Sequence, residues 1–265
     1  MNSLKNEIEK KSHFIFLSPH LDDAVWSCGG LISIASESGC RTDVITVHTG
    51  TPEESILPKL QHKEITLKGS LELRKKEDSE ALEVLNVQAQ WWDFPTRLLR
   101  KPWLRRRLDV FDTPEGDVIM QDDNYTKLKG RLYELIKTYP DAVLICPMGI
   151  GHMYDHVELF KACIEVGNEK GHLAKMFFYE DSYAILTKNR RTHFLLKDHV
   201  WSKKNAPQNT SFWWRMMGVV MVKATSRTDI RTCIPIALHD VAWSVETVNI
   251  KKEFSKKMES LSKYD

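Results

Sequence analysis

The sequence predicts an α/β fold built around a mostly parallel sheet with helices on both faces, followed by a C-terminal elaboration. Short apolar runs of strand length recur along residues 14–179, and stretches with apolar residues at helical spacing lie between them. Strands separated by helices are joined by right-handed crossovers, which bring the strands into a parallel sheet. The length of 265 residues suits one such unit, so we expect residues 1–265 to form a single domain.

Five short apolar runs are the expected strands. The first, Phe14–Leu17, is apolar throughout, as in a strand that is buried on both faces. The other runs are Asp43–His48, Gln90–Trp92, Ala142–Cys146 and Met176–Tyr179. Functional residues of parallel sheets lie beyond the carboxyl ends of the strands, so the residues that follow each run are the first candidates for a site.

Four stretches are the expected helices between these strands. The first, Ala24–Ser38, has its apolar positions on one helical face and is followed by Gly39, a typical stop signal. The other three are Leu71–Asn86, Tyr125–Tyr139 and Asp155–Lys170. Each carries inward-facing leucine, valine, isoleucine or phenylalanine at helical spacing, which predicts that each packs one face against the sheet.

Two later segments depart from this alternation. Arg97–Arg107 is basic and contains a proline, and Thr192–Lys223 mixes aromatic with polar residues. Within the second segment, Gly218–Val222 could form a strand, and further along the chain Thr247–Ser262 could form a terminal helix. The residues that follow the fifth expected strand make up the predicted C-terminal elaboration.

The composition is that of an ordinary globular protein. Apolar residues make up 42% and charged residues 28%, and a net charge of +2 gives no reason to expect nucleic acid or an anionic membrane as a partner. Five widely spaced cysteines without a CxxC pair predict reduced thiols. No segment reaches the ~18 apolar residues of a membrane span, and Met1–His13 does not resemble an export signal. We therefore expect a cytoplasmic protein without stable membrane insertion.

The first strand leads directly into the sequence Ser-Pro-His-Leu-Asp-Asp, residues 18–23. His20 and Asp23 are three residues apart, so a tight turn brings both to one centre, while Asp22 points elsewhere. A hydrolytic metal site needs oriented imidazole and carboxylate ligands, and a further carboxylate to take a proton from water. This segment can supply two ligands and the base. The alternative is that Asp22 or Asp23 caps the following helix.

The fourth strand leads into a second polar segment, residues 147–156, at the start of another helix. Gly149 and Gly151 let the backbone pass close to a ligand, and Asp155 and His156 follow them. On its own, His156 is more often an ordinary polar residue. Because both segments follow strands and each supplies what the other lacks, together they favour a His, Asp, His metal site.

These two segments resemble the signature motifs of the PIG-L/LmbE-like deacetylases. The resemblance rests on Ser18 to Asp23 with Gly29 and Gly30, and on Gly149 to His156, and it extends over residues 13–185. Weaker similarities lie at Arg74–Asp78, Asp93–Arg100, Tyr179–Asp181 and Lys252–Asp265. The family includes N-acetylglucosaminyl-phosphatidylinositol deacetylases and deacetylases of thiol, antibiotic and glycan pathways.

The resemblance implies a Rossmann-like fold and a deacetylase with one catalytic Zn²⁺ per chain. In the family's motifs, His20, Asp23 and His156 match the metal ligands, Asp22 matches the general base, and Asp155 matches the carboxylate that orients a histidine. The implied reaction is hydrolysis of the linear amide of an N-acetylated amino sugar or glycoconjugate. The identity of that sugar and the oligomeric state are not predicted.

One position departs from the family pattern. The family usually has His-x-Asp-His in the second motif, and Met153 stands here in place of the first histidine, which assists the tetrahedral intermediate. Methionine cannot donate a proton. Three alternatives follow: His152 substitutes as a catalytic residue, Asp22 handles both proton transfers, or activity is reduced. In the extreme case the protein is a sugar-binding homologue without turnover, although retention of Asp22 argues against it.

Several arginines and aromatic residues near the expected strand ends could contact substrate. Arg74 and Arg100 are the predicted substrate-binding residues, for a sugar hydroxyl or a phosphate, with solvated surface arginines as the alternative. Arg100 is the stronger candidate, because its loop follows a strand. Core packing is the favoured interpretation for the tryptophans, and His48, which has no matching partner in the sequence, is interpreted as structural.

Overall fold

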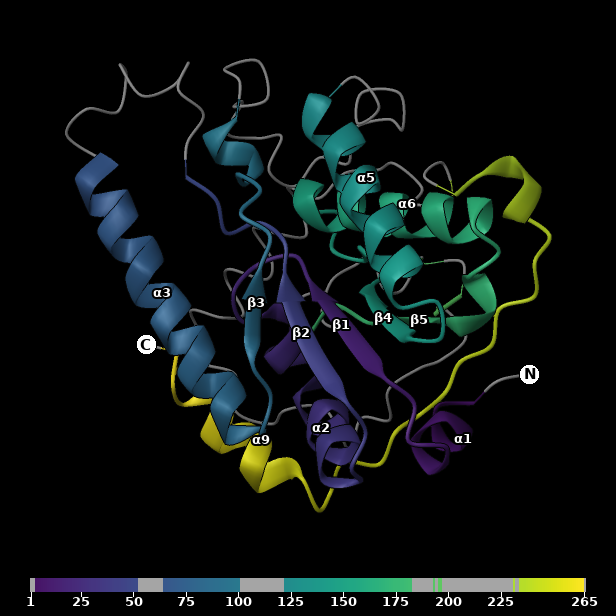
Figure 1. Cartoon of the computed structure of the whole chain (residues 1–265), viewed down its shortest axis with the longest axis horizontal. Coiled ribbons are helices and arrows are strands. Elements are labelled where there is room, and N and C mark those ends of the chain that lie inside the picture. The colour runs from purple at the N-terminus through teal and green to yellow at the C-terminus, as the bar shows by residue number, and fades with distance from the viewer. Residues whose placement is uncertain are drawn as a thin grey trace.

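A computed structural model of the chain describes residues 3–51, 64–100, 122–182, 193, 195–196, 231 and 234–264. They contain a five-stranded parallel sheet of order β3-β2-β1-β4-β5 (Figure 1). The strands are β1 (Phe14–Ser18), β2 (Thr42–Thr46), β3 (Ala89–Trp91), β4 (Val143–Pro147) and β5 (Met176–Tyr179). The predicted α/β fold is confirmed, and each strand lies within two residues of its expected bounds.

Helices cover both faces of this sheet. They are α1 (Leu4–Glu9), α2 (Asp23–Glu37), α3 (Glu64–Val84), α5 (Asp123–Thr138), α6 (Tyr154–Glu169) and α9 (Phe254–Leu261). The short 3-10 helices are η2 (Arg97–Leu99), η5 (Leu173–Lys175) and η8 (Ile236–Leu238). Figure 1 shows α2, α3 and α9 gathered on one side of the strands and α5 and α6 on the other.

The residues of β1 alternate between two hydrophobic cores. Ile15 and Leu17 pack with residues of α5 and α6, whereas Phe14 and Phe16 pack with residues of α2, α3 and α9. Val143 to Cys146 in β4 alternate in the same way. Because both faces of these strands are buried, they are apolar throughout instead of alternating with polar residues.

The N- and C-terminal parts differ from the expectation. Helix α1 begins after Ser3, whose hydroxyl accepts a hydrogen bond from the Asn6 amide, in a segment expected to be merely polar. The terminal helix is shorter than Thr247–Ser262, because residues 242–250 have an irregular backbone. The possible strand Gly218–Val222 lies outside the described residues, as do residues 101–107 of the basic segment.

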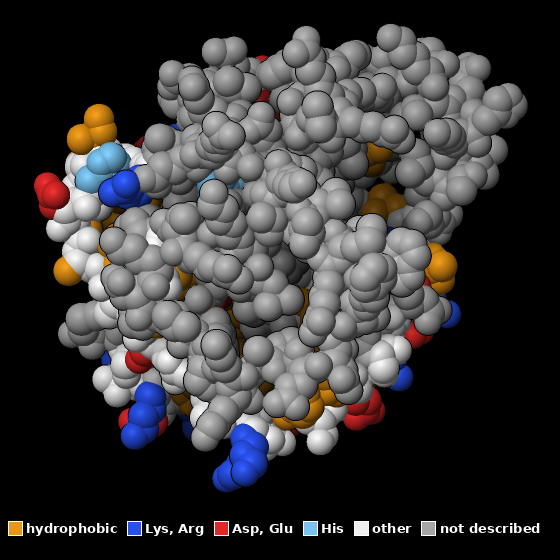
Figure 2. All heavy atoms as spheres, turned by 180° about the vertical axis from the view of Figure 1, so that it is seen from behind, with side chains coloured by type: hydrophobic (Ala, Val, Ile, Leu, Met, Phe, Trp, Pro, Cys, Tyr) orange, Lys and Arg blue, Asp and Glu red, His pale blue; other side chains and the backbone are white. Residues whose placement is uncertain are grey.

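Figure 2 shows the face opposite to that of Figure 1. The Lys and Arg side chains visible there lie along the outline, with acidic side chains among them. No helix in the described ranges is both long enough and apolar enough to cross a membrane.

The order of the strands reverses direction at β1, which lies between β2 and β4. The chain moves from β1 to β2 and β3 on one side, and later adds β4 and β5 on the other side of β1. Loops that leave β1 and β4 therefore diverge, and open α/β sheets bind ligands at such a point. The two polar segments of the sequence both begin here.

Close backbone packing at this edge depends on Gly50. A Cβ atom at Gly50 would lie 2.1 Å from the Asp93 carbonyl oxygen and 2.8 Å from the Phe94 carbonyl carbon. The Gly50 amide donates a 2.9 Å hydrogen bond to Phe94, which holds the loop after β2 against the loop after β3. Only glycine allows this approach without displacing backbone.

We expect Gly50→Ala to lower the free energy of unfolding by about 1–3 kcal/mol, the usual cost of forcing an extra carbon into packed structure. Gly130→Ala is the matched control, because a Cβ at that exposed helical position meets nothing within 4 Å. It should raise stability by up to about 1 kcal/mol through helix propensity. Urea unfolding followed by circular dichroism measures both. Equal stability of the two variants would contradict the packing argument.

Candidate metal centre and catalytic site

The turn after β1 holds its side chains through Ser18. The Ser18 hydroxyl accepts a 3.0 Å hydrogen bond from the Ala24 amide and donates one of 2.6 Å to the His20 carbonyl. Asp22 occupies the N-cap position of α2, but its side chain makes no capping hydrogen bond. The capping alternative for Asp22 is therefore wrong, since Ser18 binds the amide of Ala24 in the first turn of α2 instead. Asp22 has a positive φ of 103°, a strained conformation for a non-glycine residue.

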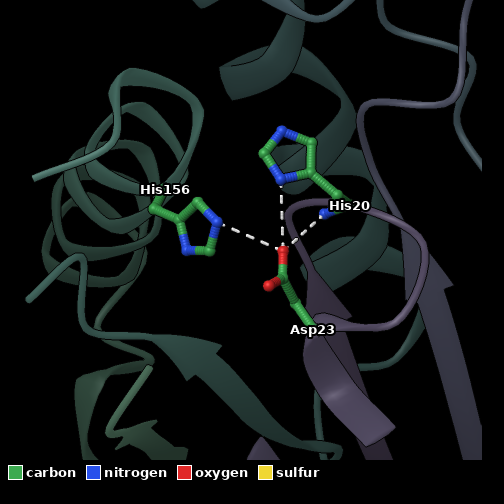
Figure 3. A group of neighbouring side chains, drawn as sticks. All are labelled: His20, Asp23 and His156. Carbon is green, nitrogen blue, oxygen red and sulfur yellow. Dashed lines mark hydrogen bonds and ion pairs between the residues drawn. The ribbon is translucent and has the colours of Figure 1, made fainter. Parts of the chain in front are cut away.

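Three predicted ligands meet around one oxygen atom. Asp23 Oδ2 lies 3.2 Å from His20 Nδ1 and 3.2 Å from His156 Nε2 (Figure 3). The ligand atoms of these residues all lie within 4.8 Å of one another. Zinc bonds of 2.0–2.1 Å in a tetrahedron place ligand atoms about 3.3 Å apart. The spacing and the mixed nitrogen and oxygen donors therefore suit a zinc ion.

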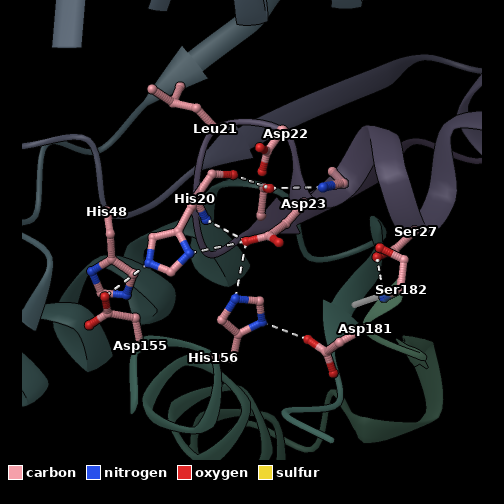
Figure 4. A network of polar contacts seen from close by, with 12 residues as sticks. His20, Leu21, Asp22, Asp23, Ser27, His48, Asp155, His156, Asp181 and Ser182 are labelled. Atoms are coloured by element: carbon pink, nitrogen blue, oxygen red, sulfur yellow. Dashed lines mark hydrogen bonds and ion pairs between the residues drawn. The ribbon is translucent and has the colours of Figure 1, made fainter. Parts of the chain in front are cut away.

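A second carboxylate orients each imidazole. His20 Nε2 lies 2.9 Å from Asp155 Oδ2, and His156 Nδ1 lies 2.6 Å from Asp181 Oδ1 (Figure 4). Each ring thus turns one nitrogen to Asp23 and the other to a fixed acceptor. Metal-binding histidines typically have this arrangement, because the outer carboxylate fixes the tautomer and the ring orientation.

The two outer carboxylates are themselves held by backbone amides. Asp155 accepts hydrogen bonds from the Arg97 amide at 3.0 and 3.3 Å, and Asp181 accepts one of 2.9 Å from the Ile150 amide. The Ser182 amide, next to Asp181, donates to the Ser27 hydroxyl on α2 (Figure 4). Loops from four strand ends are therefore fixed around the three ligands.

The charges of the site favour a cation at its centre. Burial alone would lower the pKa of both imidazoles, but the neighbouring carboxylates raise it to about 9 for His20 and to about 10 for His156. Burial would raise the pKa of Asp23, yet His156 and His20 hold it well below its usual range. An anionic oxygen is thus held between two imidazoles. The same carboxylates would also attract a metal ion bound between the two rings.

Asp22 lies beside this centre but outside its hydrogen bonds (Figure 4). Its carboxylate is 30% exposed and lies 3.2 Å from the Arg74 guanidinium, which also donates to the Leu21 carbonyl at 3.0 Å. Burial and the charge of Asp23 raise the pKa of Asp22 to about 7, against the opposing effects of Arg74 and His20. A carboxyl group in this position can exchange a proton near neutral pH.

Arg74 and Arg100 occupy different environments. The Arg74 side chain is 47% exposed at the rim beside Asp22, whereas Arg100 is 1% exposed. All five Arg100 donors bind inside the protein, to Pro95, Asp122, Glu158 and His48. Arg100 thus borders the site through Asp155, at 3.6 Å, but its donors are engaged inside the protein. A contact between Arg100 and substrate stays a prediction.

His152 is buried in the loop before α6. It is 6% exposed and has a φ of 60°, and its amide donates to the Gly149 carbonyl at 3.0 Å. The side chain of His152 therefore does not face solvent. Met153 takes the N-cap position of α6 without a side-chain hydrogen bond to the helix. A catalytic role of His152 stays a prediction.

Three polar residues of this region were not among the predicted site residues. Asp181 follows β5 directly, so the rule of inspecting each strand end could have identified it. His48 was interpreted as structural, and its ring centroid lies 5.8 Å from that of His20. Glu158 lies one helical turn after Asp155, and its burial beside Arg100 had no signal in the sequence.

Comparison with known proteins gives a family and a fold. The model of a family described as PIG-L, GlcNAc-PI de-N-acetylase, matches residues 15–166, which is 152 of the 265 residues. No curated protein sequence matches the chain.

Two solved structures are similar at low sequence identity. The zinc-inhibited form of a teicoplanin deacetylase has a TM-score of 0.54 and 22% identity, over 80% of this chain and 83% of that one. The deacetylase–bog complex in the biosynthesis pathway of teicoplanin has a TM-score of 0.54 and 20% identity, over 87% of this chain and 88% of that one. At these identities the likeness shows a shared fold.

We expect Asp181→Asn to weaken zinc binding by about 10- to 100-fold, the usual effect of losing an outer carboxylate on a ligand histidine. The amide keeps the size of the side chain but loses the charge that holds His156. Competition with a fluorescent chelator measures the affinity. Asp141→Asn is the control, because that carboxylate is exposed and bonds only Lys175 on the surface. Similar affinities of the two variants would show that Asp181 does not orient the ligand.

Proposed function

Since this chain belongs to the PIG-L family, we propose that it is a zinc-dependent hydrolase that removes an N-acyl group, in the simplest case an acetyl group, from an amino sugar or glycoside. The observation that carries the proposal is that three potential ligands converge and that a further carboxylate, which is not one of them, lies beside them. His20, Asp23 and His156 are sufficient to hold a metal ion, and Asp22 stands next to them without being needed for that purpose. A protein that merely stored the ion would have no use for it.

His20, Asp23 and His156 would hold one zinc ion. Bound there, the ion would supply Lewis-acid polarisation of a water molecule and of the amide carbonyl. Asp155 and Asp181 keep the two imidazoles turned toward that site. They are positioning residues in this proposal, because they act through the ligands.

Asp22 is the proposed proton carrier. Its carboxylate takes a proton from the attacking water as a new carbon–oxygen bond forms at the amide carbonyl. The carbon–nitrogen bond then breaks, and Asp22 returns the proton to the leaving amine. The products are a carboxylate, in the simplest case acetate, and a free amino sugar. A pKa of about 7 suits both steps, because the group must accept and release the proton at the same pH.

Arg74 is the proposed substrate contact. Its guanidinium binds Asp22 and the Leu21 carbonyl while nearly half of the side chain stays exposed. The exposed part of the side chain can bind a sugar hydroxyl or a phosphate of a substrate that lies beside Asp22. Arg100 is buried, so Arg74 is the better placed of the two predicted residues.

We expect Asp22→Asn to retain one zinc ion per chain but to lower turnover by roughly 10²-fold or more, because the amide cannot accept a proton from water. Release of acetate from a panel of N-acetylglucosamine conjugates measures turnover, and elemental analysis measures zinc. Asp141→Asn should behave as the wild type. Loss of zinc together with activity would show that Asp22 is the metal ligand and that Asp23 is the base. Absence of turnover by the wild-type, zinc-loaded protein on every conjugate would favour the sugar-binding homologue.

The remaining role is stabilisation of the tetrahedral intermediate, for which Met153 offers no donor. We expect His152→Ala to lower the maximal rate more than it raises the Michaelis constant, by about 2–4 kcal/mol in transition-state stabilisation. In that case Met153→His should bring little gain. A silent His152→Ala together with a faster Met153→His would instead show that the donor is missing. Steady-state kinetics on one accepted substrate distinguishes the two outcomes.

A further inference from the structure

A second group of potential metal ligands lies directly behind the first. His48, Asp155 and Glu158 each offer one ligand atom, and these atoms all lie within 4.8 Å of one another. All three residues are buried. Figure 4 shows His48 and Asp155 next to each other on the side of His20 that faces away from Asp23. Asp155 is shared, because its Oδ2 atom also binds His20 Nε2 at 2.9 Å.

The guanidinium of Arg100 occupies this group. Its Nη1 and Nη2 atoms bind the two Glu158 oxygens at 2.8 Å each, in a bidentate pair. Nη2 also lies 3.3 Å from His48 Nδ1 and 3.6 Å from Asp155 Oδ1. The cation of Arg100 thus contacts every member of the ligand group.

One nitrogen of the group still has the character of an open ligand. His48 Nε2 is buried and has no hydrogen-bond partner among the residues that the structure describes, and it lies 3.7 Å from Glu158 Oε2. The side chain of His48 is fully inaccessible to solvent. An imidazole nitrogen and carboxylate oxygens are both among the donors that bind zinc in proteins.

The local charge requires a cation at this place. Asp122 adds a third buried carboxylate, 2.8 Å from Arg100 Nη1, to those of Asp155 and Glu158. Buried carboxylates without a positive partner are strongly destabilising. Arg100 supplies this cation, because its guanidinium binds both Asp122 and Glu158.

We infer that Arg100 is the resident cation of a latent second metal site, and that it limits this centre to one metal ion. Without the guanidinium, His48, Asp155 and Glu158 would bind a second divalent ion of the zinc type. Such an ion would draw Asp155 away from His20, so Arg100 also preserves the outer contact of a first-site ligand. The inference concerns metal stoichiometry and does not depend on which bond the protein hydrolyses.

The test is the number of zinc ions per chain in Arg100→Ala, Arg100→Lys and the wild type, measured by elemental analysis after zinc loading and gel filtration. We expect two ions in Arg100→Ala and one in Arg100→Lys, because the ammonium group keeps a cation in the pocket. The double variant Arg100→Ala with Glu158→Gln should return to one ion, since it lacks a ligand of the second group. Arg131→Ala, which removes an arginine on α5 that stacks on Trp92, is the matched control and should hold one ion.

Arg100→Ala leaves three buried carboxylates without a cation, so its folding is measured as well. If the variant is unfolded without metal, zinc or cobalt should restore its circular dichroism spectrum, whereas magnesium should not, because magnesium disfavours imidazole ligands. A single zinc ion in folded Arg100→Ala, or an unfolded variant that zinc and cobalt fail to restore, would overturn the inference. A wild type without zinc, beside an Arg100→Ala variant that gains one ion, would instead reject the proposed function and support the second site.

Discussion

The organisation of the site depends on one constraint, that every buried charge at the carboxyl edge of the sheet must face a fixed partner of opposite charge. Asp23 Oδ2 is the centre of this arrangement, because it accepts from the His20 amide at 3.0 Å and lies against both imidazoles. Outward from Asp23 the charges alternate along two paths. One runs through His20 to Asp155 and then to Arg100, and the other runs through His156 to Asp181. Each layer fixes the orientation of the layer inside it. The three proposed ligands are therefore held in place by contacts within the protein, which is the preorganisation that the proposed metal site needs.

The same constraint explains how the local backbone is used. Ser18 caps the first turn of α2, so the adjacent aspartates are not consumed by the helix terminus. Asp22 adopts a strained φ of 103° to place its carboxylate beside, and not within, the ligand set. Strain of this kind persists where surrounding contacts overdetermine a residue, and here Arg74 binds both Asp22 and the Leu21 carbonyl.

Much of the fold and the centre of the site could be predicted from the sequence, because both rest on short-range patterns. The apolar runs at β1 and β4 are bounded by polar residues, and parallel pairing of these strands brings His20 and His156 to one edge. The environment of Arg100 could not be predicted, since its burial depends on the path of a loop past residues of α6. Exposed and buried arginines have the same sequence signal. His152 was among the predicted catalytic residues, but its burial in the loop before α6 had no signal in the sequence. Asp181 lies just beyond the end of β5, where the rule of inspecting each strand end applies, and it was left out of the predicted site.

The pairing of β1 with β4 has a thermodynamic consequence. His20 and Asp155 are 135 residues apart in sequence and lie in contact only when both halves of the sheet are assembled. Ligands supplied by two distant segments do not form a site in the unfolded chain, so free energy gained on binding an ion stabilises the folded state alone. A change that separates the two halves of the sheet therefore also takes these side chains apart.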